Sequence, residues 1–342
     1  MFCPIMTQLN HCLTFGFPLT IRGSRRAKAC WTYGIDLSTG EYLSMKRNLF
    51  FVTASVLALS ATAAMASDNT VYLNQSGTEQ KADITQEGAA SSVGNNGWFI
   101  QAALASGDAG NYLSVSQTST SNASTSNGYQ YGSNNTAHLT QSGYASNIVL
   151  QQYGNDNGRP TSNVGPSDVI TQNGTAYQSN VTLSQGGNSN LFSISQGGYQ
   201  NNVTATQSGN SNELTIQQAL YYDGTYGYYY NQIKSTQSGN ANKSDFSQIG
   251  SYNQIDSTQY GNEKARIYQI GYNNRSVGYQ YGGGNTVSID QGVNGVAYGT
   301  NNYANYAQSG TGLQLNLTQT GNNNQSNTVQ SGIGSIATII QK

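Results

Sequence analysis

From residue 69 to the C-terminus, hydrophobic and polar side chains alternate in short segments that each end in glutamine. In the segment 190–196, Phe192, Ile194 and Gln196 fall on one face, while Ser193 and Ser195 fall on the other. A period of two residues is typical of a β-strand with one face buried. The segments 212–218, 253–259 and 285–291 follow the same pattern. The sequence therefore predicts a series of short β-strands.

A regular repeat spaces these strands. The motif Gln-x-Gly-x-x-Asn-x-x-x-x-x-Gln recurs with a step of 11 residues from one Gln to the next. Because Gly adopts positive φ at no steric cost, the x-Gly-x-x after each Gln is predicted to be a tight turn. Each unit is then one strand and one turn, and two units form a rung of 22 residues. Complete copies span 185–196, 196–207, 207–218, 237–248, 248–259, 269–280, 280–291 and 319–330, and copies that replace only the Asn span 75–86, 141–152, 308–319 and 330–341.

The repeat predicts an all-β fold, a β-solenoid of about ten two-strand rungs. Stacked rungs place like residues above one another, so inward Asn and Gln would form ladders of amide hydrogen bonds, as in cross-β amyloid, within one chain. Where the step between Gln residues exceeds 11, we expect loops that leave the stack, near 89–110, 118–134, 153–165, 219–230 and 292–301. The 20 predicted strands end at the Gln residues 75, 86, 117, 141, 152, 172, 185, 196, 207, 218, 237, 248, 259, 269, 280, 291, 308, 319, 330 and 341.

The candidate functional positions are the inward amides and the turn glycines of the repeat. The amides would hold the ladders together, and the glycines would allow the turns to close. These positions are Gln185, Gly187, Asn190, Gln196, Gly198, Asn201, Gln207, Gly209, Asn212, Gln218, Gln237, Gly239, Asn242, Gln248, Gly250, Asn253, Gln259, Gln269, Gly271, Asn274, Gln280, Gly282, Asn285, Gln291, Gln319, Gly321, Asn324 and Gln330.

Charged residues within the predicted strands test which face is inward. An unpaired buried charge is very costly, so a closed interior requires charges on the outward face. Of 13 such residues, 11 fall outward, and only Asp168 and Glu263 fall inward. The outward residues are Lys81, Asp83, Glu213, Lys234, Lys243, Asp245, Asp256, Lys264, Arg266, Arg275 and Asp290.

Composition excludes several classes of protein. Charged residues make up 8% of the 342 residues, and 14 Lys and Arg face 15 Asp and Glu. This balance excludes a basic nucleic-acid-binding protein and a disordered chain of high net charge. Gly, Tyr, Asn and Gln take the place of the charged residues that a typical soluble domain carries.

The N-terminal region carries the features of an export signal. Met45-Lys46-Arg47 precedes an apolar run over 49–64 and a small-residue site that ends at Ala66, which is the order of a secretory signal peptide. We therefore expect a non-native upstream extension at 1–44, a signal peptide at 45–66 and an exported solenoid over 67–342. The alternative for 49–64 is a buried core helix. The run is too short for a comfortable membrane span, so an integral membrane protein is not expected.

The ends of the predicted stack suggest polymerisation. All three cysteines lie within 1–44, so disulfides are not expected to hold the exported part. The first strand would begin three residues after the cleavage site, and the last would end one residue before the C-terminus, so we expect no polar cap on either end rung. Uncapped strand edges template pairing with another chain, and top-to-bottom pairing produces an open filament.

The repeat resembles the curlin repeat of curli fibre subunits. The stretch 185–218 matches it without gaps, and the resemblance extends over about 69–341 with insertions. It implies an extracellular cross-β fibre on a Gram-negative bacterium, with roles in biofilm matrix and surface adhesion. It also implies export through a dedicated outer-membrane pore and nucleation by a sister subunit. The ladder positions that it implies are Gln185, Asn190, Gln196, Asn201, Gln207, Asn212 and Gln218 and their equivalents in later repeats.

The chain departs from this family in two respects. Major subunits usually carry a Gly- and Asn-rich segment without repeats that the pore recognises, whereas here the repeats begin almost at once. The chain also has more repeats than usual and long insertions. Its last strand, 335–341, stays near the pattern, which favours a major subunit over a nucleator, for which a divergent and more basic last repeat is expected.

Two other functions are alternatives. An enzyme of the parallel β-helix type needs clustered acids, bases or metal ligands, but the exported part has one histidine, His138, at an outward position. We therefore expect no enzymatic activity, no cofactor and no metal. A soluble solenoid adhesin would favour outward Thr ladders, whereas the outward positions mix Ser, Thr, Tyr and charged residues. The Tyr-rich segment 221–230 is either a loop tip with incidental aromatics or an adhesive patch or lateral contact between fibres.

Overall fold

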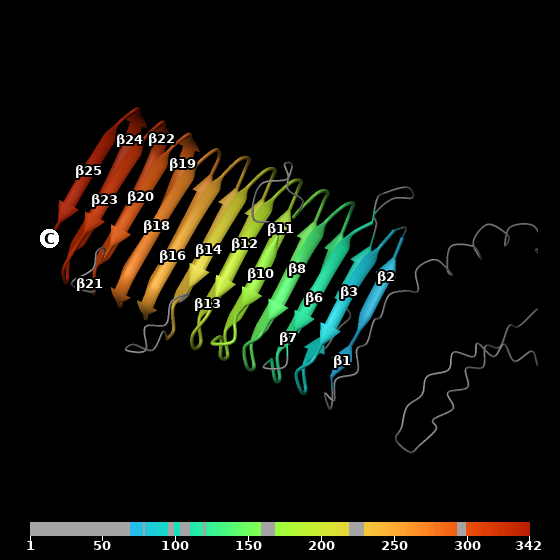
Figure 1. The fold of residues 1–342 in the computed structure, drawn as a ribbon. Coiled ribbons are helices and arrows are strands. Elements are labelled where there is room, and N and C mark those ends of the chain that lie inside the picture. The colour runs from blue at the N-terminus through green and yellow to red at the C-terminus, as the bar shows by residue number, and fades with distance from the viewer. Residues whose placement is uncertain are drawn as a thin grey trace, which may run out of the picture. The chain divides into compact units, whose positions relative to one another are not determined.

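The structure is a computed structural model, and it describes residues 69–77, 79–94, 99–102, 110–118, 121–158, 168–218, 229–292 and 299–342. The expected extension at 1–44 and the expected signal peptide at 45–66 lie outside the described residues. All regular structure in the described part of the chain is β-strand, arranged in two parallel sheets (Figure 1).

Each sheet collects every second strand of the repeat. Sheet A contains β1 (Thr70–Val71), β2 (Leu73–Ser76), β4 (Ser92–Val93), β5 (Phe99–Ala102), β7 (Thr125–Tyr131), β9 (Asn147–Tyr153), β11 (Asn180–Gly186), β13 (Asn202–Ser208), β15 (Gln232–Ser238), β17 (Gln254–Tyr260), β19 (Arg275–Gly283), β22 (Tyr303–Thr311) and β24 (Gln325–Ile333). Sheet B contains β3 (Lys81–Gln86), β6 (Tyr112–Gln117), β8 (Thr136–Gln141), β10 (Val169–Gln172), β12 (Leu191–Gln196), β14 (Glu213–Gln218), β16 (Lys243–Ser251), β18 (Lys264–Tyr272), β20 (Thr286–Gln291), β21 (Gly299–Thr300), β23 (Gln314–Gln319) and β25 (Ile336–Gln341).

The chain alternates between the sheets, so each rung pairs a strand of sheet A with the next strand of sheet B. Neighbouring rungs are parallel and in register: Gln185 pairs with Gln207 in sheet A, and Gln196 pairs with Gln218 in sheet B. Figure 1 shows the rungs following one another from β2, in blue, to β25, in red. The prediction of an all-β solenoid is confirmed, and the described residues hold 11 Gln-ended strands in each sheet.

The solenoid includes strands that the repeat pattern did not predict. The expected loop 89–110 contains β4 and β5, and the expected loop 118–134 contains β7. β7 escapes a search for hydrophobic alternation because its inward positions hold Ser126 and Gly128 instead of aliphatic residues. A signal for it existed, because 130–141 is a further complete copy of the repeat. The expected loop 292–301 contains the short strand β21, which pairs with β18.

A thin core fills the space between the sheets. Each typical strand contributes two inward residues beside its Gln, such as Phe192 and Ile194 of β12, which are both 1% exposed. Burying one such side chain contributes about 1.5–3 kcal/mol. Nearer the C-terminus, Gly278 leaves a gap that the ring of Tyr306 fills from the next rung, and the Tyr306 hydroxyl lies 2.8 Å from Oγ of Ser257, two rungs away.

Charged residues follow the predicted alternation. The 11 residues predicted to face outward are exposed or half-buried, whereas Asp168 and Glu263 are fully buried. Some outward charges pair between rungs, as do Lys243 with Glu213 at 2.9 Å and Arg266 with Asp290 at 3.0 Å. Such exposed ion pairs stabilise a fold by less than about 1 kcal/mol each.

The typical turn contains two residues with positive φ. One is the Gly two positions after the Gln: Gly187 has φ 97°, and a Cβ there would lie 2.1 Å from the carbonyl oxygen of Gly209 in the next rung. The other is the residue before the ladder Asn, such as Ser189 with φ 57° or Tyr252 with φ 59°. The repeat pattern did not predict this second position. Among the described residues, no β-branched side chain has positive φ, as the sterics of this region demand.

Adjacent glycines of one turn give a matched test. Gly187→Ala would push a methyl group against a backbone carbonyl at a positive φ, whereas a Cβ on Gly186 meets nothing within 4 Å. We expect Gly187→Ala to lower the free energy of unfolding by about 1–3 kcal/mol or more. Gly186→Ala should leave it unchanged or raise it by about 0.4–1 kcal/mol. Urea unfolding followed by circular dichroism measures both, and equal effects would contradict this account of the turn.

Candidate assembly site: amide ladders and end rungs

Each sheet carries an unbroken ladder of Gln side chains along the solenoid. Nε2 of Gln185 donates to Oε1 of Gln207 at 2.7 Å, and Nε2 of Gln207 donates to Oε1 of Gln237 at 2.8 Å. In both ladders each Nε2 except the last donates to the Gln on its C-terminal side. Sheet A joins Gln75, Gln101, Gln130, Gln152, Gln185, Gln207, Gln237, Gln259, Gln280, Gln308 and Gln330 in this way. Sheet B joins Gln86, Gln117, Gln141, Gln172, Gln196, Gln218, Gln248, Gln269, Gln291, Gln319 and Gln341.

The same Gln side chains tie the two sheets together. Nε2 of Gln196, at the end of β12, also donates to the carbonyl oxygen of Asn180, at the start of β11, at 3.2 Å. Nε2 of Gln207 donates to the carbonyl oxygen of Leu191, at the start of β12, at 3.1 Å. A buried amide therefore satisfies one hydrogen bond along the stack and one across it, which avoids the cost of an unpaired polar group.

Asn side chains form a second pair of columns at the starts of the strands. In the sheet B column, Nδ2 and the backbone N–H of Asn212 both donate to Oδ1 of Asn190 at 3.0 Å. In the sheet A column, the backbone N–H of Asn231 donates to Oδ1 of Asn201 at 2.9 Å. These bonds run toward the N-terminal end. The Asn–Asn bonds and the Gln–Gln bonds therefore run in opposite directions along the stack.

The structure brings the candidate residues together in these columns. Every Gln among them belongs to one of the two Gln ladders, and the Asn residues fall in the two Asn columns. The turn glycines have positive φ, between 78° at Gly198 and 129° at Gly282. Two residues of the Gln ladders were missed, Gln101 and Gln130, and the 11-residue step to Gln141 was the signal that could have found Gln130. The Asn columns also contain residues that were not predicted: Asn111, Asn135, Asn157, Asn231 and Asn302.

The end rungs leave strand edges unpaired within the described part of the chain. β24 and β25 pair only with β22 and β23, and β2 and β3 pair only with β5 and β6. Core side chains at these ends are half-buried, including Leu73 and Ala82 at one end and Ala337 and Ile339 at the other. Their inward faces lack the neighbour that every internal rung supplies.

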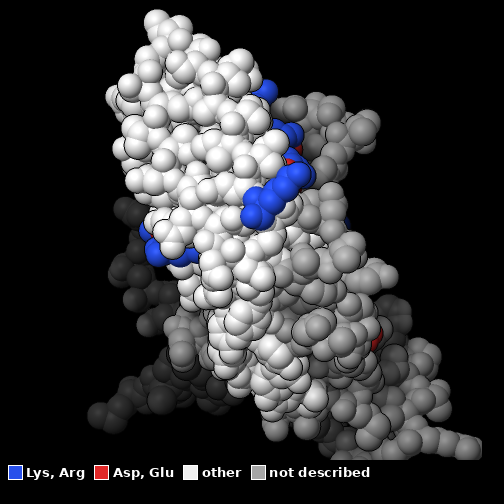
Figure 2. Space-filling view, turned by 90° about the vertical axis from the view of Figure 1, so that its left-hand side faces the viewer, with Lys and Arg blue, Asp and Glu red and all other residues white. Residues whose placement is uncertain are grey.

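The C-terminal end also presents apolar side chains on its outer surface. Val329, Ile333, Ile336 and Ile340 are between 65% and 85% exposed. The segment 299–341 contains no charged residue. Figure 2 looks at this end of the solenoid, and the view is mostly white, with Lys and Arg gathered in a few places.

Comparison with known families is consistent with this geometry. The model of the curlin associated repeat matches residues 187–219 and 264–292, which are ladder-forming stretches of the solenoid. These two stretches are similar to the curlin repeat family. This family comprises structural subunits of extracellular bacterial fibres. A comparison with curated proteins finds no match.

Two buried acids interrupt the neutral interior of the curlin-repeat protein. Glu263 takes an Asn position, where its carboxylate accepts the backbone N–H of Asn285 at 2.7 Å, and burial raises its pKa. Asp168 precedes β10 in the inward column of Ala137 and Phe192, and neither carboxylate oxygen has a hydrogen-bond partner among the described residues. Burial raises the pKa of Asp168 to about 8.

Other chemistry-bearing groups of the curlin-repeat protein are isolated. His138 lies half-buried on the outer face of β8, its ring 5.3 Å from that of Tyr112, and burial lowers its pKa. Among the described residues, no cluster of three His, Cys, Asp or Glu side chains could hold a metal ion. No helix in the described ranges is long and apolar enough to cross a membrane.

Neighbouring glutamines of β14 test the ladder. Gln218 is buried and bonds to Gln196 and Gln248 at 2.8 Å, whereas Gln217 is exposed. Gln218→Ala would take one ladder partner from each of two buried amides, Gln196 and Gln248, so we expect the free energy of unfolding to fall by about 2 kcal/mol or more. Gln217→Ala should change it by less than about 0.5 kcal/mol. Urea unfolding compares the two variants, and a smaller loss for Gln218→Ala would contradict the ladder.

Asp168 makes stability depend on pH. Its pKa rises on folding from 3.8 to about 8. The stabilisation that protonated Asp168 contributes is therefore complete below pH 3.8 and is lost as the pH rises through about 8. We expect the urea midpoint of the wild type to fall between mildly acidic and mildly alkaline buffer. Asp168→Asn should flatten this profile and raise the midpoint at alkaline pH. An unchanged profile in Asp168→Asn would mean that another group, such as Glu263, carries the dependence.

Proposed function

We propose that this curlin-repeat protein is a structural subunit of extracellular curli-type amyloid fibres that assembles end to end. The observation that carries the proposal is the pair of end rungs, each with one neighbouring rung among the described residues, whose strand edges and core side chains match those of an internal rung. A second copy placed on the end continues both sheets and both Gln ladders. The contact joins the top of one chain to the bottom of the next, so it propagates without closing.

The repeat sets the register of this junction. Continuing the ladders aligns Gln330 with Gln75 of the next copy and Gln341 with Gln86. Ala337 then lies over Ala82 and Ile339 over Ile84, so the half-buried side chains of Ala82, Ala337 and Ile339 are covered by the other copy. Each buried apolar side chain would contribute about 1.5–3 kcal/mol.

The polarity of the ladders supports one direction of stacking. Oε1 of Gln341 accepts a bond from Nε2 of Gln319 at 2.7 Å, so among the described residues Nε2 of Gln341 has no further ladder Gln to which it could donate. At the opposite end, Nε2 of Gln86 donates to Gln117, and Oε1 of Gln86 has no ladder Gln before it among the described residues. A donor end therefore meets an acceptor end only when copies stack head to tail. The charges at the N-terminal end are compatible with this contact. Lys81 and Asp83 neutralise each other at 3.1 Å, and they would face β25, which contains no charged residue.

The finer role that we propose is that of a major subunit in the biofilm matrix and in surface adhesion. β25 keeps the ladder Gln341 and pairs in register with β23, as a strand that supports elongation must. On this proposal, the signal peptide at 45–66 directs export from a Gram-negative cell, and residues 67–342 pass an outer-membrane pore. A sister subunit nucleates growth, and the protein itself has no enzymatic activity, cofactor or nucleic-acid partner.

Two adjacent isoleucines of β25 test the end-to-end contact. Ile339 is half-buried and faces the core, whereas Ile340 faces outward and is 65% exposed. Ile339→Asp would bury a charge at the junction, so we expect it to abolish elongation of wild-type seeds while circular dichroism of the chain stays β-rich. Ile340→Asp should elongate at close to the wild-type rate. Seeded growth followed by light scattering measures both, and unimpaired growth of Ile339→Asp would refute the proposal.

A further inference from the structure

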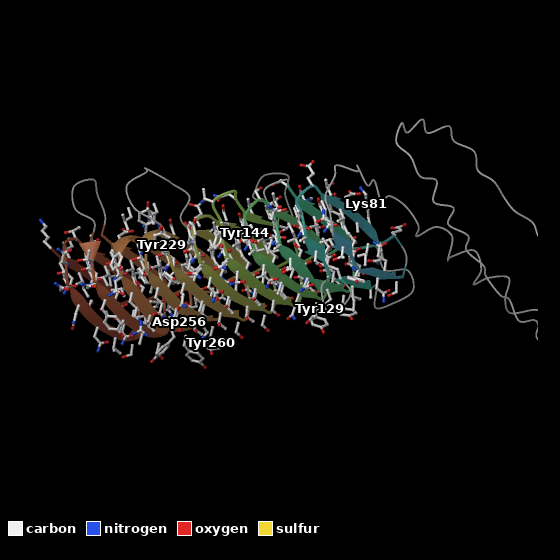
Figure 3. All side chains as sticks on the ribbon, turned by 90° about the horizontal axis from the view of Figure 1, so that it is seen from below. Lys81, Tyr129, Tyr144, Tyr229, Asp256 and Tyr260 are labelled. Carbon is white, nitrogen blue, oxygen red and sulfur yellow. The ribbon has the colours of Figure 1, made fainter. Side chains whose placement is uncertain are left out.

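Tyrosine side chains form a continuous ridge along one edge of the solenoid. They occupy six successive turns from sheet B to sheet A, and Figure 3 shows Tyr144 and Tyr229 on this edge, with Tyr129 and Tyr260 on the opposite one. Their backbones are themselves paired, because parallel bridges join Tyr144 to Tyr177, Tyr177 to Tyr199 and Tyr199 to Tyr229. The tyrosine ridge consists of Tyr144, Tyr177, Tyr199, Tyr229, Tyr230, Tyr252 and Tyr272.

Ring contacts connect the ridge from rung to rung. The ring centroids of Tyr144 and Tyr177 are 5.1 Å apart, those of Tyr177 and Tyr199 are 4.9 Å apart, and those of Tyr199 and Tyr229 are 5.2 Å apart. Tyr230 and Tyr229 share one turn, and Tyr230 starts a second run in which Tyr252 lies 5.1 Å from both Tyr230 and Tyr272. Neighbouring phenols are therefore held in contact by the register of the sheets.

The orientation of the rings limits what the ridge can do. Tyr144 and Tyr177 are inclined by only 13°, and Tyr230 and Tyr252 by 25°, so in these two pairs much of each flat face is turned toward the next ring. The rings of Tyr199 and Tyr229 and those of Tyr252 and Tyr272 are inclined by 53° and 55°. A planar ligand or a sugar ring would need those faces. The rings remain accessible to solvent, since Tyr144, Tyr199, Tyr252 and Tyr272 are between 44% and 50% exposed. Reactive phenols held beside one another are the chemistry that this surface offers.

We propose that the tyrosine ridge is a site of oxidative cross-linking, where dityrosine bonds covalently join successive rungs of one chain. The co-reactant is hydrogen peroxide used by a peroxidase-type one-electron oxidant. Each of two neighbouring phenols loses one electron and one proton, and the two phenoxyl radicals couple through their ortho carbons. Tautomerisation restores both phenols, so two tyrosines and one hydrogen peroxide give one dityrosine and two waters. Holding the rings in contact replaces a diffusive encounter of two radicals, which raises the effective concentration of the partner.

The ridge stops short of both end rungs. Beyond Tyr272, the same turn position holds Thr300 and then Asn322, which bond to each other at 2.8 Å. The cross-links therefore join rungs within one chain and leave the ends of the solenoid unmodified. They close loops between residues such as Tyr177 and Tyr199, so they restrict the unfolded chain as a disulfide does. This proposal concerns a single chain and does not depend on its assembly into fibres.

Peroxidase treatment of the purified chain with limiting hydrogen peroxide tests the proposal. Free tyrosine in a parallel reaction shows that the oxidant is active. We expect blue dityrosine fluorescence, a product that migrates as a single chain, and a mass loss of two hydrogens per link. Digestion and tandem mass spectrometry should place the links between ridge neighbours. The urea midpoint of the cross-linked chain should be higher than that of the untreated chain.

Conservative variants separate ordered coupling from random oxidation. Tyr199→Phe keeps the ring and should remove the links to Tyr177 and Tyr229 while the links within 230–272 remain. Tyr279→Phe is the matched control, since Tyr279 is 51% exposed and has no ring neighbour among the described residues. It should leave all ridge links in place. Links mainly between chains, links between tyrosines that are not neighbours, or no dityrosine from a folded chain would each overturn the proposal.

Discussion

The need to satisfy buried amides governs this structure. A Gln side chain in a dry interior must find partners for its carbonyl and its N–H groups, and a lost partner costs about 1–3 kcal/mol. Here Gln207 receives a bond from Gln185, donates one to Gln237 and donates another to the carbonyl oxygen of Leu191. A slip of one residue would break these bonds and would turn the hydrophobic side chains toward solvent. The ladders therefore set the register of the strands. This register determines which residues stack on one another in all the remaining columns.

The same constraint explains why the ends differ from the middle. An internal rung offers its amides, strand edges and two core residues per strand to neighbours on both sides. The end rungs have one neighbour each within the described residues, so Leu73, Ala82, Ala337 and Ile339 are only half-buried. The parts that hold rungs together inside one chain are thus available between chains. In this account, the same amide hydrogen bonds stabilise the folded chain and the contact between chains. Because the Gln–Gln bonds all run in one direction along the stack and the Asn–Asn bonds in the other, copies continue both ladders only when they stack head to tail.

The repeat was sufficient to predict the sheets, the inward face and most ladder residues, because an 11-residue step and a two-residue alternation leave few alternatives. It failed where local composition hides the period. β7 was missed because Ser126 and Gly128 face inward, although Gln130 keeps the step to Gln141. The positive φ at Ser189 and Tyr252 could not be predicted, since the closing of the turn imposes it on residues with no preference for it. The tyrosine ridge was also hidden, because Tyr229 and Tyr230 lie beside distant residues that only the stacked register aligns.

The register of the junction between chains is the most direct test of the central claim. Asp83→Cys and Thr338→Cys would place thiols on outward positions that face each other when Gln86 continues the ladder of Gln341, about 4.8 Å apart between Cα atoms. Residues 67–342 contain no native cysteine to compete, and a disulfide tolerates this separation. Mild oxidation of fibres grown from a mixture of the two variants should give disulfide-linked dimers. The offset pair Asp83→Cys with Ile336→Cys should give far fewer. Equal yields, or more dimer from the offset pair, would contradict in-register stacking of the end rungs.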